Sequence, residues 1–398
     1  MLKKIKYLLY GVENYSKQLI FEVNNFNMNL SFWELETYFR NVDFIIIGSG
    51  IVGLSTAYHL RRKHPEAKIV IIEKGMLPEG ASTKNAGFAC FGTLSEVLWY
   101  LESNSEEEVY KLVEKRFKGL QKLRSLIPDK KMDYNQFGGY EIFRESDKEL
   151  MEMSLLNLDK INSWLKPIFN ENVYRKSDKN FGFQNTIGMI ETDFEGHIHT
   201  GKMMKSFVEL VISNQISILN NVEVKSINDL NSEVEIELEN GFHFNSKKVF
   251  LCTNAFTKKL YDLDVVPARA QVLVTKPIEN LPFKGCFHMD EGFYYFRNIG
   301  NRVLFGGGRN LDLEGETTTD FGTTDLIQNQ LETYLKEIIL PNHKFEIDHR
   351  WSGIMGMGEK RSPIVKQLSN NVFCGVRLTG TGIAIGSIVG EELADLVD

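Results

Sequence analysis

The first regular hydrophobic pattern in the chain is a run of four apolar residues, Phe44–Ile47, that follows Asp43. An uninterrupted run of this length is typical of a strand that is buried on both faces of a parallel sheet. After a glycine-rich gap, a second apolar run follows at Ile69–Ile72. Between the two runs, apolar residues recur at helical spacing, at Leu54, Ala57, Tyr58 and Leu60. The pattern therefore predicts a strand, a turn, a helix and a second strand over residues 43–72.

The predicted turn has the sequence Gly48-Ser-Gly50-Ile-Val-Gly53. Gly48 permits a tight turn, Gly50 lets the backbone approach a pyrophosphate, and Gly53 lets the helix pack closely on the strand. The helix N-terminus offers free N–H groups and a positive dipole end to the phosphates. Glu73 follows the second strand, where it can accept hydrogen bonds from a ribose diol. Together these parts predict a site for a dinucleotide without a 2′-phosphate, either FAD or NAD.

The rest of the pattern predicts two domains that interleave along the chain. Apolar residues at helical spacing make residues 94–190 mostly helical, and alternating patterns predict antiparallel strands at 269–275, 293–297 and 302–306. We expect an α/β fold (α+β overall), with a Rossmann-like domain and an interleaved substrate domain built on an antiparallel sheet. The expected divisions are an N-terminal extension (1–40), a discontinuous nucleotide-binding domain (41–93, 191–265 and 346–398) and a discontinuous substrate domain (94–190 and 266–345).

Composition and charge exclude several classes of protein. With 46 Lys and Arg against 53 Asp and Glu, the net charge of −7 lacks the basic surface that a nucleic-acid-binding protein needs. No apolar stretch approaches the roughly 18 residues of a membrane span, and no cleavable signal is evident, so a cytoplasmic protein is expected. Four cysteines without CxxC spacing argue against a zinc or iron–sulfur site. Residues 1–27 are interpreted as an irregular leader, either a dispensable arm or not part of the native protein.

The segment Gly80–Gly92 (GASTKNAGFACFG) is small and polar and directly follows the second strand. Such a stretch suits a backbone that is pressed against a flat ligand. It resembles the flavin-contacting segment of the D-amino-acid oxidase-like (DAO) family of FAD-dependent oxidoreductases. That family includes glycine oxidase, sarcosine oxidase and the γ-glutamylputrescine oxidase-like amine oxidases. The resemblance covers residues 41–398 and is nearest to the γ-glutamylputrescine oxidase-like and glycine oxidase-like branches.

Three later segments carry the same resemblance. Val224 precedes a hairpin and stands where family members meet the adenine, and Thr253-Asn254 ends a strand at the dinucleotide pocket. A second glycine turn near the C-terminus corresponds to the helix N-terminus that faces the flavin pyrimidine. The resemblance thus implies non-covalent FAD held by Gly48, Gly50, Ile51, Val52, Gly53, Glu73, Lys74, Ser82, Thr83, Lys84, Asn85, Ala86, Gly87, Val224, Thr253, Asn254, Gly380, Thr381, Gly382 and Ile383.

The resemblance also implies oxidation of the C–N bond of a small amine or amino acid, by hydride transfer to flavin N5 and hydrolysis of the imine. Amino-acid-oxidising members carry a carboxylate-binding arginine shortly after Trp-x-Gly, but Met355 occupies that position in this chain. Arg309 is the candidate replacement, with a solvated loop arginine as the alternative. Arg361 is expected to support the loop near the flavin. Tyr294 is expected to face the flavin, with a core aromatic as the alternative.

The electron acceptor is left open between O₂ and another carrier. Sarcosine oxidase-like members use a lysine to help reduce oxygen, and the matching position is Leu304. Covalent attachment in that branch uses a cysteine near Met357, which is absent here. His197 and His199 form an HxH pair, but no third ligand is evident, so no metal site is predicted. Two alternatives stay open, an NAD-dependent dehydrogenase and a flavin-binding protein without turnover.

Overall fold

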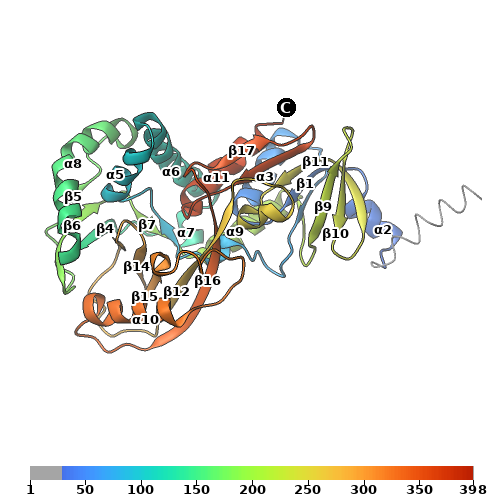
Figure 1. The fold of residues 1–398 in the computed structure, drawn as a ribbon. Helices are drawn as coiled ribbons and strands as arrows, with labels where there is room; N and C mark the ends of the chain where they lie inside the picture. Colours follow the sequence, from blue (N-terminus) through green and yellow to red (C-terminus); the bar gives the residue numbers. More distant parts are fainter. Residues whose placement is uncertain (1–28, 398) are drawn as a thin grey trace, which may run out of the picture.

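The computed structural model describes residues 29–397, so the leader at residues 1–27 lies outside the described part. The molecule is elongated, and its two large sheets lie toward opposite ends (Figure 1). In that view the sheet at the right carries the glycine-rich turn. The predicted combination of a Rossmann-like domain with a second, mainly antiparallel sheet is confirmed. None of the helices in the described part is long and apolar enough to cross a lipid bilayer.

The first sheet is built around the two apolar runs of the sequence. Its central strands are parallel, because each is followed by a crossover that returns the chain to the same edge. The buried registers place Ile46 opposite both Ile71 and Phe250. The order is β17 (Ile364–Gln367), β18 (Val372–Val376), β11 (His243–Leu251), β1 (Val42–Ile47), β2 (Ile69–Ile72) and β8 (Ser217–Leu219), with β9 (Val224–Asp229) and β10 (Val234–Leu238) attached to β11.

Helices cover one face of this sheet, and the β9–β10 hairpin and the N-terminal segment contribute to the other. Phe39, from the predicted N-terminal extension, packs edge-on against Phe242 and Phe244, so this part of the extension belongs to the core. Helix packing is tight: a Cβ on Gly119 would lie 2.2 Å from the Ala384 carbonyl oxygen. The segments are α2 (Phe32–Glu34), η1 (Leu35–Phe39), α3 (Ile51–Lys63), α6 (Glu106–Leu126), α9 (Thr200–Ser213) and α11 (Gly382–Ala394).

The second sheet has eight strands and two differently covered faces. On one face, α10 (Asp325–Tyr334) closes an aromatic core, while α5 (Leu94–Ser103), α6 and α8 (Lys148–Phe169) cover part of the other (Figure 1). The strands follow the order β16 (Ile347–Met357), β12 (Val266–Thr275), β15 (Arg302–Gly307), β14 (Tyr294–Ile299), β13 (Cys286–Met289), β4 (Gly139–Arg144), β6 (Thr186–Thr192) and β5 (Arg175–Lys176). All neighbouring pairs are antiparallel except β13 and β4.

Strands β4, β6 and β16 of this sheet are among those that differ from the sequence interpretation. Strands β4 and β6 lie in a stretch that was expected to be mostly helical, and the buried acids Glu141 and Glu191 interrupt their apolar patterns. Strand β16 follows the expected boundary at residue 346, yet it pairs with β12 along its length. The sheet to which β16 belongs is therefore the one expected to carry substrate. The division of the chain into domains itself stays a prediction.

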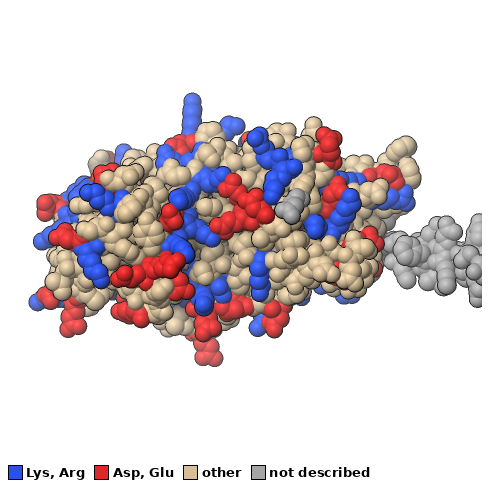
Figure 2. All heavy atoms as spheres, turned by 90° about the horizontal axis from the view of Figure 1, so that it is seen from above, with Lys and Arg blue, Asp and Glu red and all other residues tan. Residues whose placement is uncertain are grey.

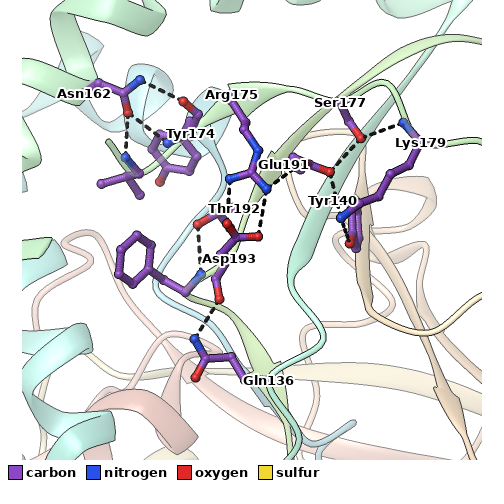
Figure 3. A network of polar contacts seen from close by, with 12 residues as sticks. Gln136, Tyr140, Asn162, Tyr174, Arg175, Ser177, Lys179, Glu191, Thr192 and Asp193 are labelled. Atoms are coloured by element: carbon purple, nitrogen blue, oxygen red, sulfur yellow. Dashed lines mark hydrogen bonds and ion pairs between the residues drawn. The ribbon is translucent and has the colours of Figure 1, made fainter. Parts of the chain in front are cut away.

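A polar network ties the outer strands of the second sheet together (Figure 3). The buried Glu191 carboxylate meets the Arg175 guanidinium at 2.7 Å, the Ser177 hydroxyl at 2.8 Å and the Lys179 ammonium at 3.2 Å. Arg175 also holds Asp193 with two hydrogen bonds. Because each charge has a partner, the network offsets the cost of burying Glu191.

Charged side chains are distributed without a strong bias on the face shown in Figure 2. Lysines and arginines are interspersed with aspartates and glutamates along the length of the molecule. Such mixing gives that face no extended basic surface of the kind that tracks a phosphate backbone.

Candidate active site

A cavity of about 380 Å³ runs between the two sheets, within the usual range for ligand sites of roughly 300–1,000 Å³. It begins at the carboxyl ends of β1 and β2, at Gly48 and Glu73, and extends to Tyr295 in the second sheet and to Arg309, which follows β15. The predicted cofactor residues that line it are Gly48, Gly50, Ile51, Val52, Glu73, Lys74, Ser82, Lys84, Asn85, Ala86, Gly87, Val224, Thr253, Asn254, Gly380, Thr381, Gly382 and Ile383.

Two predicted cofactor residues, Gly53 and Thr83, do not line the cavity but hold the backbone around it. A Cβ on Gly53 would lie 2.0 Å from the Gly48 carbonyl oxygen, so only glycine lets α3 approach β1 this closely. The Thr83 hydroxyl donates to the carbonyls of Pro78 and Gly80 and holds the bend before the flavin segment.

Glu73 accepts three hydrogen bonds, and two of them tie it to the glycine-rich turn. Its Oε2 accepts from the Ser49 backbone N–H at 3.0 Å and the Ser49 hydroxyl at 2.7 Å. Its Oε1 accepts from the Gly75 N–H at 3.0 Å. A carboxylate has about four lone-pair sites, so one remains for a hydroxyl in the cavity. Glu73 therefore shapes the turn as well as offering an acceptor, a role that spacing alone did not indicate.

The predicted flavin segment begins with a short helix, α4 (Ala81–Lys84), and its backbone is anchored on several sides. The Ser82 hydroxyl accepts from the Ile51 N–H at 3.0 Å, which joins the segment to the start of α3. The Asn85 side chain accepts from the Gly87 N–H at 2.8 Å and donates to the Ala81 carbonyl at 3.0 Å. These contacts hold the segment against the cavity wall.

The second sheet supplies the other anchors of this segment. The buried Arg297 donates to the carbonyls of Ala86 at 2.5 Å and Ile198 at 3.0 Å, and the Trp351 indole donates to the Lys84 carbonyl at 2.8 Å. Burial lowers the pKa of Arg297 to about 10. Sequence reasoning missed this role of Arg297. Alternation in β14 places its side chain on the same face as Tyr295, but it does not show which groups the guanidinium contacts.

At the other side of the cavity, Asn254 joins the end of β11 to the C-terminal glycine turn. Its side-chain oxygen accepts from the N–H groups of Arg377 at 3.0 Å and Leu378 at 3.3 Å. Gly380 has a φ of +84°, a conformation that side chains rarely adopt, and it leads into α11. The first residues of α11 thereby reach the cavity.

The expected orientation of Tyr294 is wrong. Its side chain is 1% exposed and packs with Tyr334 and Phe305 in the aromatic core on the α10 side of the sheet. Tyr295 lines the cavity instead, because successive residues of a strand point to opposite faces. Burial raises the pKa of Tyr295 to about 12, so its hydroxyl stays protonated at neutral pH.

Met355, Arg309 and Arg361 all line the cavity, close to the aromatic side chains of α5. The Arg361 guanidinium carbon lies 4.8 Å from the centre of the Trp99 ring. Burial and the charge of Arg361 both lower the pKa of Arg309. Neither arginine forms an ion pair within residues 29–397, so two neighbouring positive charges face the cavity without a carboxylate partner.

The predicted histidine pair does not form a common site. His197 lies in β7 (Gly196–His197), and burial lowers its pKa to about 4. His199 is the N-cap of α9 and accepts from the Lys202 N–H. A different histidine, His288, lines the cavity and is bonded to Glu195. Sequence reasoning missed His288 because β13 carries no recognisable motif around it.

Arg116 is a further residue that the sequence did not single out. It is fully buried in α6 and donates to the Phe91 carbonyl at 2.9 Å, to Glu96 at 3.1 Å and to the Tyr100 hydroxyl at 3.1 Å. Glu96 and Tyr100 line the cavity, so Arg116 positions the α5 wall from behind. A charged residue inside an amphipathic helix gives no sequence signal of this kind.

The residues present fit FAD. The cavity links a glycine turn and an acidic strand end, which suit an adenosine diphosphate, to a backbone cradle that suits a flat ring. The cradle is narrow: a Cβ on Gly50 would lie 2.9 Å from the Ser82 hydroxyl oxygen, and one on Gly353 would lie 2.8 Å from the Lys84 Cβ. FAD supplies a two-electron acceptor in such a site.

Solved structures with the same fold include oxidases and a dehydrogenase. Iminodiacetate oxidase from Chelativorans sp. BNC1 is 19% identical with a TM-score of 0.71, covering 89% of this chain and 95% of that one. Glycine oxidase from Geobacillus kaustophilus is 17% identical with a TM-score of 0.71, covering 90% and 94%. L-Proline dehydrogenase from P. horikoshii is 15% identical with a TM-score of 0.70, covering 90% and 93%.

Matches to curated sequences are short. Thiamine thiazole synthase from Phaeosphaeria nodorum is 45% identical over 51 residues, which is 13% of this chain and 15% of the relative's length. A far longer match is to the family described as DAO, FAD dependent oxidoreductase, which spans residues 43–396. With the glycine turn, the flavin cradle and the second sheet in place, the chain belongs to the DAO family of FAD-dependent oxidoreductases.

Proposed function

We propose that the protein oxidises the C–N bond of a small amino acid whose carboxylate is held by Arg309 and Arg361. The substrate carbon gives a hydride to N5 of FAD, and water then hydrolyses the imine. The observation that carries the proposal is the pair of arginines that line the cavity near enough for the charge of Arg361 to lower the pKa of Arg309. Arginine suits a carboxylate because its planar donors can bind both oxygens.

Electrostatics supports an anionic ligand at this position. Two guanidinium groups that repel each other in a partly desolvated cavity destabilise the empty site, as the lowered pKa of Arg309 indicates. A carboxylate between them would relieve that repulsion. Met355 occupies the position where amino-acid-oxidising members carry arginine, and its thioether cannot supply this charge.

The state of the flavin and its electron acceptor are further parts of the proposal. FAD is bound non-covalently, and acid precipitation should release the yellow colour from the protein. Leu304 is buried beside Ala86 and Val272, so an apolar side chain stands where oxygen-reducing relatives carry lysine. The final electron acceptor is either O₂ or another carrier, and the rate of flavin reoxidation in air distinguishes them. A cytoplasmic location stays a prediction from the sequence.

The test is anaerobic flavin reduction with a panel of amino acids and their decarboxylated amines. The variants Arg309→Met and Arg361→Met should each raise KM for an amino acid at least tenfold and leave KM for the matching amine within about twofold. Arg62→Met, an exposed arginine on α3, is the matched control and should change neither value. Equal effects on the acid and the amine would contradict the carboxylate role.

The same panel tests the alternative that the protein binds flavin but does not turn over a substrate. If no amine or amino acid reduces the bound flavin, while dithionite does, the proposed function is wrong. The family match to FAD-dependent oxidoreductases gives no support to the NAD-dependent alternative.

A further inference from the structure

A buried acid–base pair lies at the substrate end of the cavity. His288, in β13, is 8% exposed and lines the cavity with its register partner Tyr295. Phe88, at the end of the flavin segment, packs edge-on against the His288 ring at 5.2 Å and against the Tyr295 ring at 5.5 Å. His288 thus shares one wall of the cavity with Phe88, from the predicted flavin segment, and with Tyr295.

Glu195 completes the pair from behind the cavity wall. Its Oε2 lies 3.0 Å from His288 Nε2, and its side chain is 1% exposed. Its Oε1 is buried without a hydrogen-bond partner. An incompletely paired buried carboxylate is costly, and a proton on the imidazole lowers that cost by converting the contact into an ion pair. The geometry therefore favours proton uptake at His288.

The groups around the pair reinforce this preference. Burial alone would lower the pKa of His288, but the charges of Glu195, Glu96 and Glu141 raise it above the ordinary value. Cys90 also faces the pair; burial and nearby carboxylates raise the pKa of its thiol well above the usual range, so it stays protonated. Burial raises the pKa of Glu141 to about 7, although Ser95 donates to it.

A second cavity, of about 10 Å³, adjoins the pair. His288, Glu195 and Glu141 line it with Thr93 and Tyr174. This volume is at the lower limit for one water molecule, and the lining supplies polar partners for it. The pair thus stands between the ligand cavity and a small polar pocket that also reaches Glu141.

We propose that His288 accepts the ammonium proton of the bound substrate, with Glu195 as the positioning residue that stabilises the resulting imidazolium. The inference rests on the proposed function. The substrate nitrogen loses one proton to His288, which frees its lone pair. The adjacent carbon then gives a hydride, which carries two electrons and one proton, to FAD. As this C–H bond breaks, the nitrogen lone pair forms the C=N bond. One proton therefore leaves the substrate nitrogen in each turnover, besides the hydride.

The other acids at this end of the cavity are less suited to the task. Glu96 already accepts from Tyr100 and from Arg116. Glu291 lies on the hairpin turn before Gly292, and although burial and the charges of Asp290 and Glu102 raise its pKa, no second side chain within residues 29–397 holds it as Glu195 holds His288. An imidazole with a carboxylate behind it matches a proton acceptor working near neutral pH.

The kinetic test is the pH dependence of anaerobic flavin reduction by a substrate from the panel. The wild-type rate should rise with pH along a single limb. His288→Gln should lower the rate at pH 7 at least 100-fold and abolish this limb, since general bases contribute roughly 10²–10⁴-fold. Glu195→Gln should move the limb to lower pH, because the imidazolium loses its partner. His243→Gln, on the exposed hairpin, should leave the profile unchanged.

The second test needs no turnover and covers a His288 variant that fails to fold. Histidine ring signals of the FAD-bound protein are titrated by NMR, and the His288 signal is assigned by its loss in His288→Gln or, where that variant fails to fold, in His288→Asn. A midpoint above 6.5 that falls in Glu195→Gln supports the pair. A midpoint that does not move, or a kinetic limb that survives in His288→Gln or ignores Glu195→Gln, overturns the inference.

The two proposals fail in different ways. If panel members reduce the flavin but the His288 variant keeps the wild-type pH profile, only the proton acceptor is wrong. If nothing in the panel reduces the flavin, the proposed function is wrong and the inference fails with it, whatever the NMR titration shows.

Discussion

Replacing Glu73 with glutamine tests the link between the glycine turn and FAD. In the structure its two oxygens accept from the Ser49 N–H, the Ser49 hydroxyl and the Gly75 N–H. Glutamine keeps one acceptor oxygen and places an amide NH₂ where the other was. The Ser49 hydroxyl can rotate to accept from that NH₂, but a backbone N–H cannot, so either Ser49 or Gly75 loses its acceptor in Glu73→Gln.

The magnitude follows from these contacts. One buried N–H without an acceptor costs about 1–3 kcal/mol, and this loss should appear in the unfolding free energy of the apoprotein. The remaining lone-pair site of Glu73 is available to a ribose hydroxyl. A hydrogen bond to a charged acceptor exceeds a neutral one by about 1 kcal/mol or slightly more, which corresponds to a roughly tenfold weaker FAD affinity.

The assays are urea unfolding of the apoprotein and quenching of FAD fluorescence on binding. Glu223→Gln is the matched control. Glu223 also lines the cavity, but its side chain is 42% exposed, and its Oε1 lies 3.6 Å from Nζ of the exposed Lys259. It should change the unfolding free energy by less than about 0.5 kcal/mol. The reasoning is refuted if Glu73→Gln matches this control in stability and binds FAD within twofold of wild type.

Three further predictions concern the second sheet and the helices that cover it. Tyr295→Phe should change kcat/KM severalfold or more because the hydroxyl lines the cavity, whereas Tyr294→Phe should leave it within twofold; steady-state kinetics on the pair decides. Arg116→Met leaves Glu96 without its cation and should cost about 3–5 kcal/mol in urea unfolding; a cost below 1 kcal/mol would contradict the positioning role. The folded pKa of Glu141, about 7, exceeds its unfolded value, so the folded state binds more protons and stability should fall by up to about 3 kcal/mol as pH rises from 4.5 to 7. In Glu141→Gln that slope should flatten, as measured by unfolding across this pH range.

The nucleotide half of the site could be predicted from the sequence because its chemistry is local. Gly48, Gly50 and Gly53 lie on one turn, and Glu73 ends the neighbouring strand, so spacing alone brings them together. The flavin segment at 80–92 follows directly. In these stretches the backbone itself shapes the site, and the sequence shows this as glycines or a short run of small polar residues.

The substrate half could not be predicted in the same way. His288, Glu195 and Arg116 come from three distant segments, and only the second sheet and its covering helices bring them to one wall. The error at Tyr294 has a related cause. Alternation correctly separates Tyr294 from Tyr295, but which of the two faces the flavin depends on where α10 packs, and α10 lies some 30 residues later.

The contacts of the flavin cradle indicate which part of it each half of the site holds in place. Its start is tied to the nucleotide domain by Ser82, whereas the carbonyls of Lys84 and Ala86 are held by Trp351 and Arg297 from the second sheet. The same sheet carries Tyr295 and His288, and Arg309 follows its strand β15 in the short helix η4 (Arg309–Leu311). The position of the flavin ring relative to the substrate groups is therefore determined within one sheet. Changes in the glycine turn should weaken FAD binding without altering the chemistry of the FAD that remains bound, while changes at Arg297 should alter both.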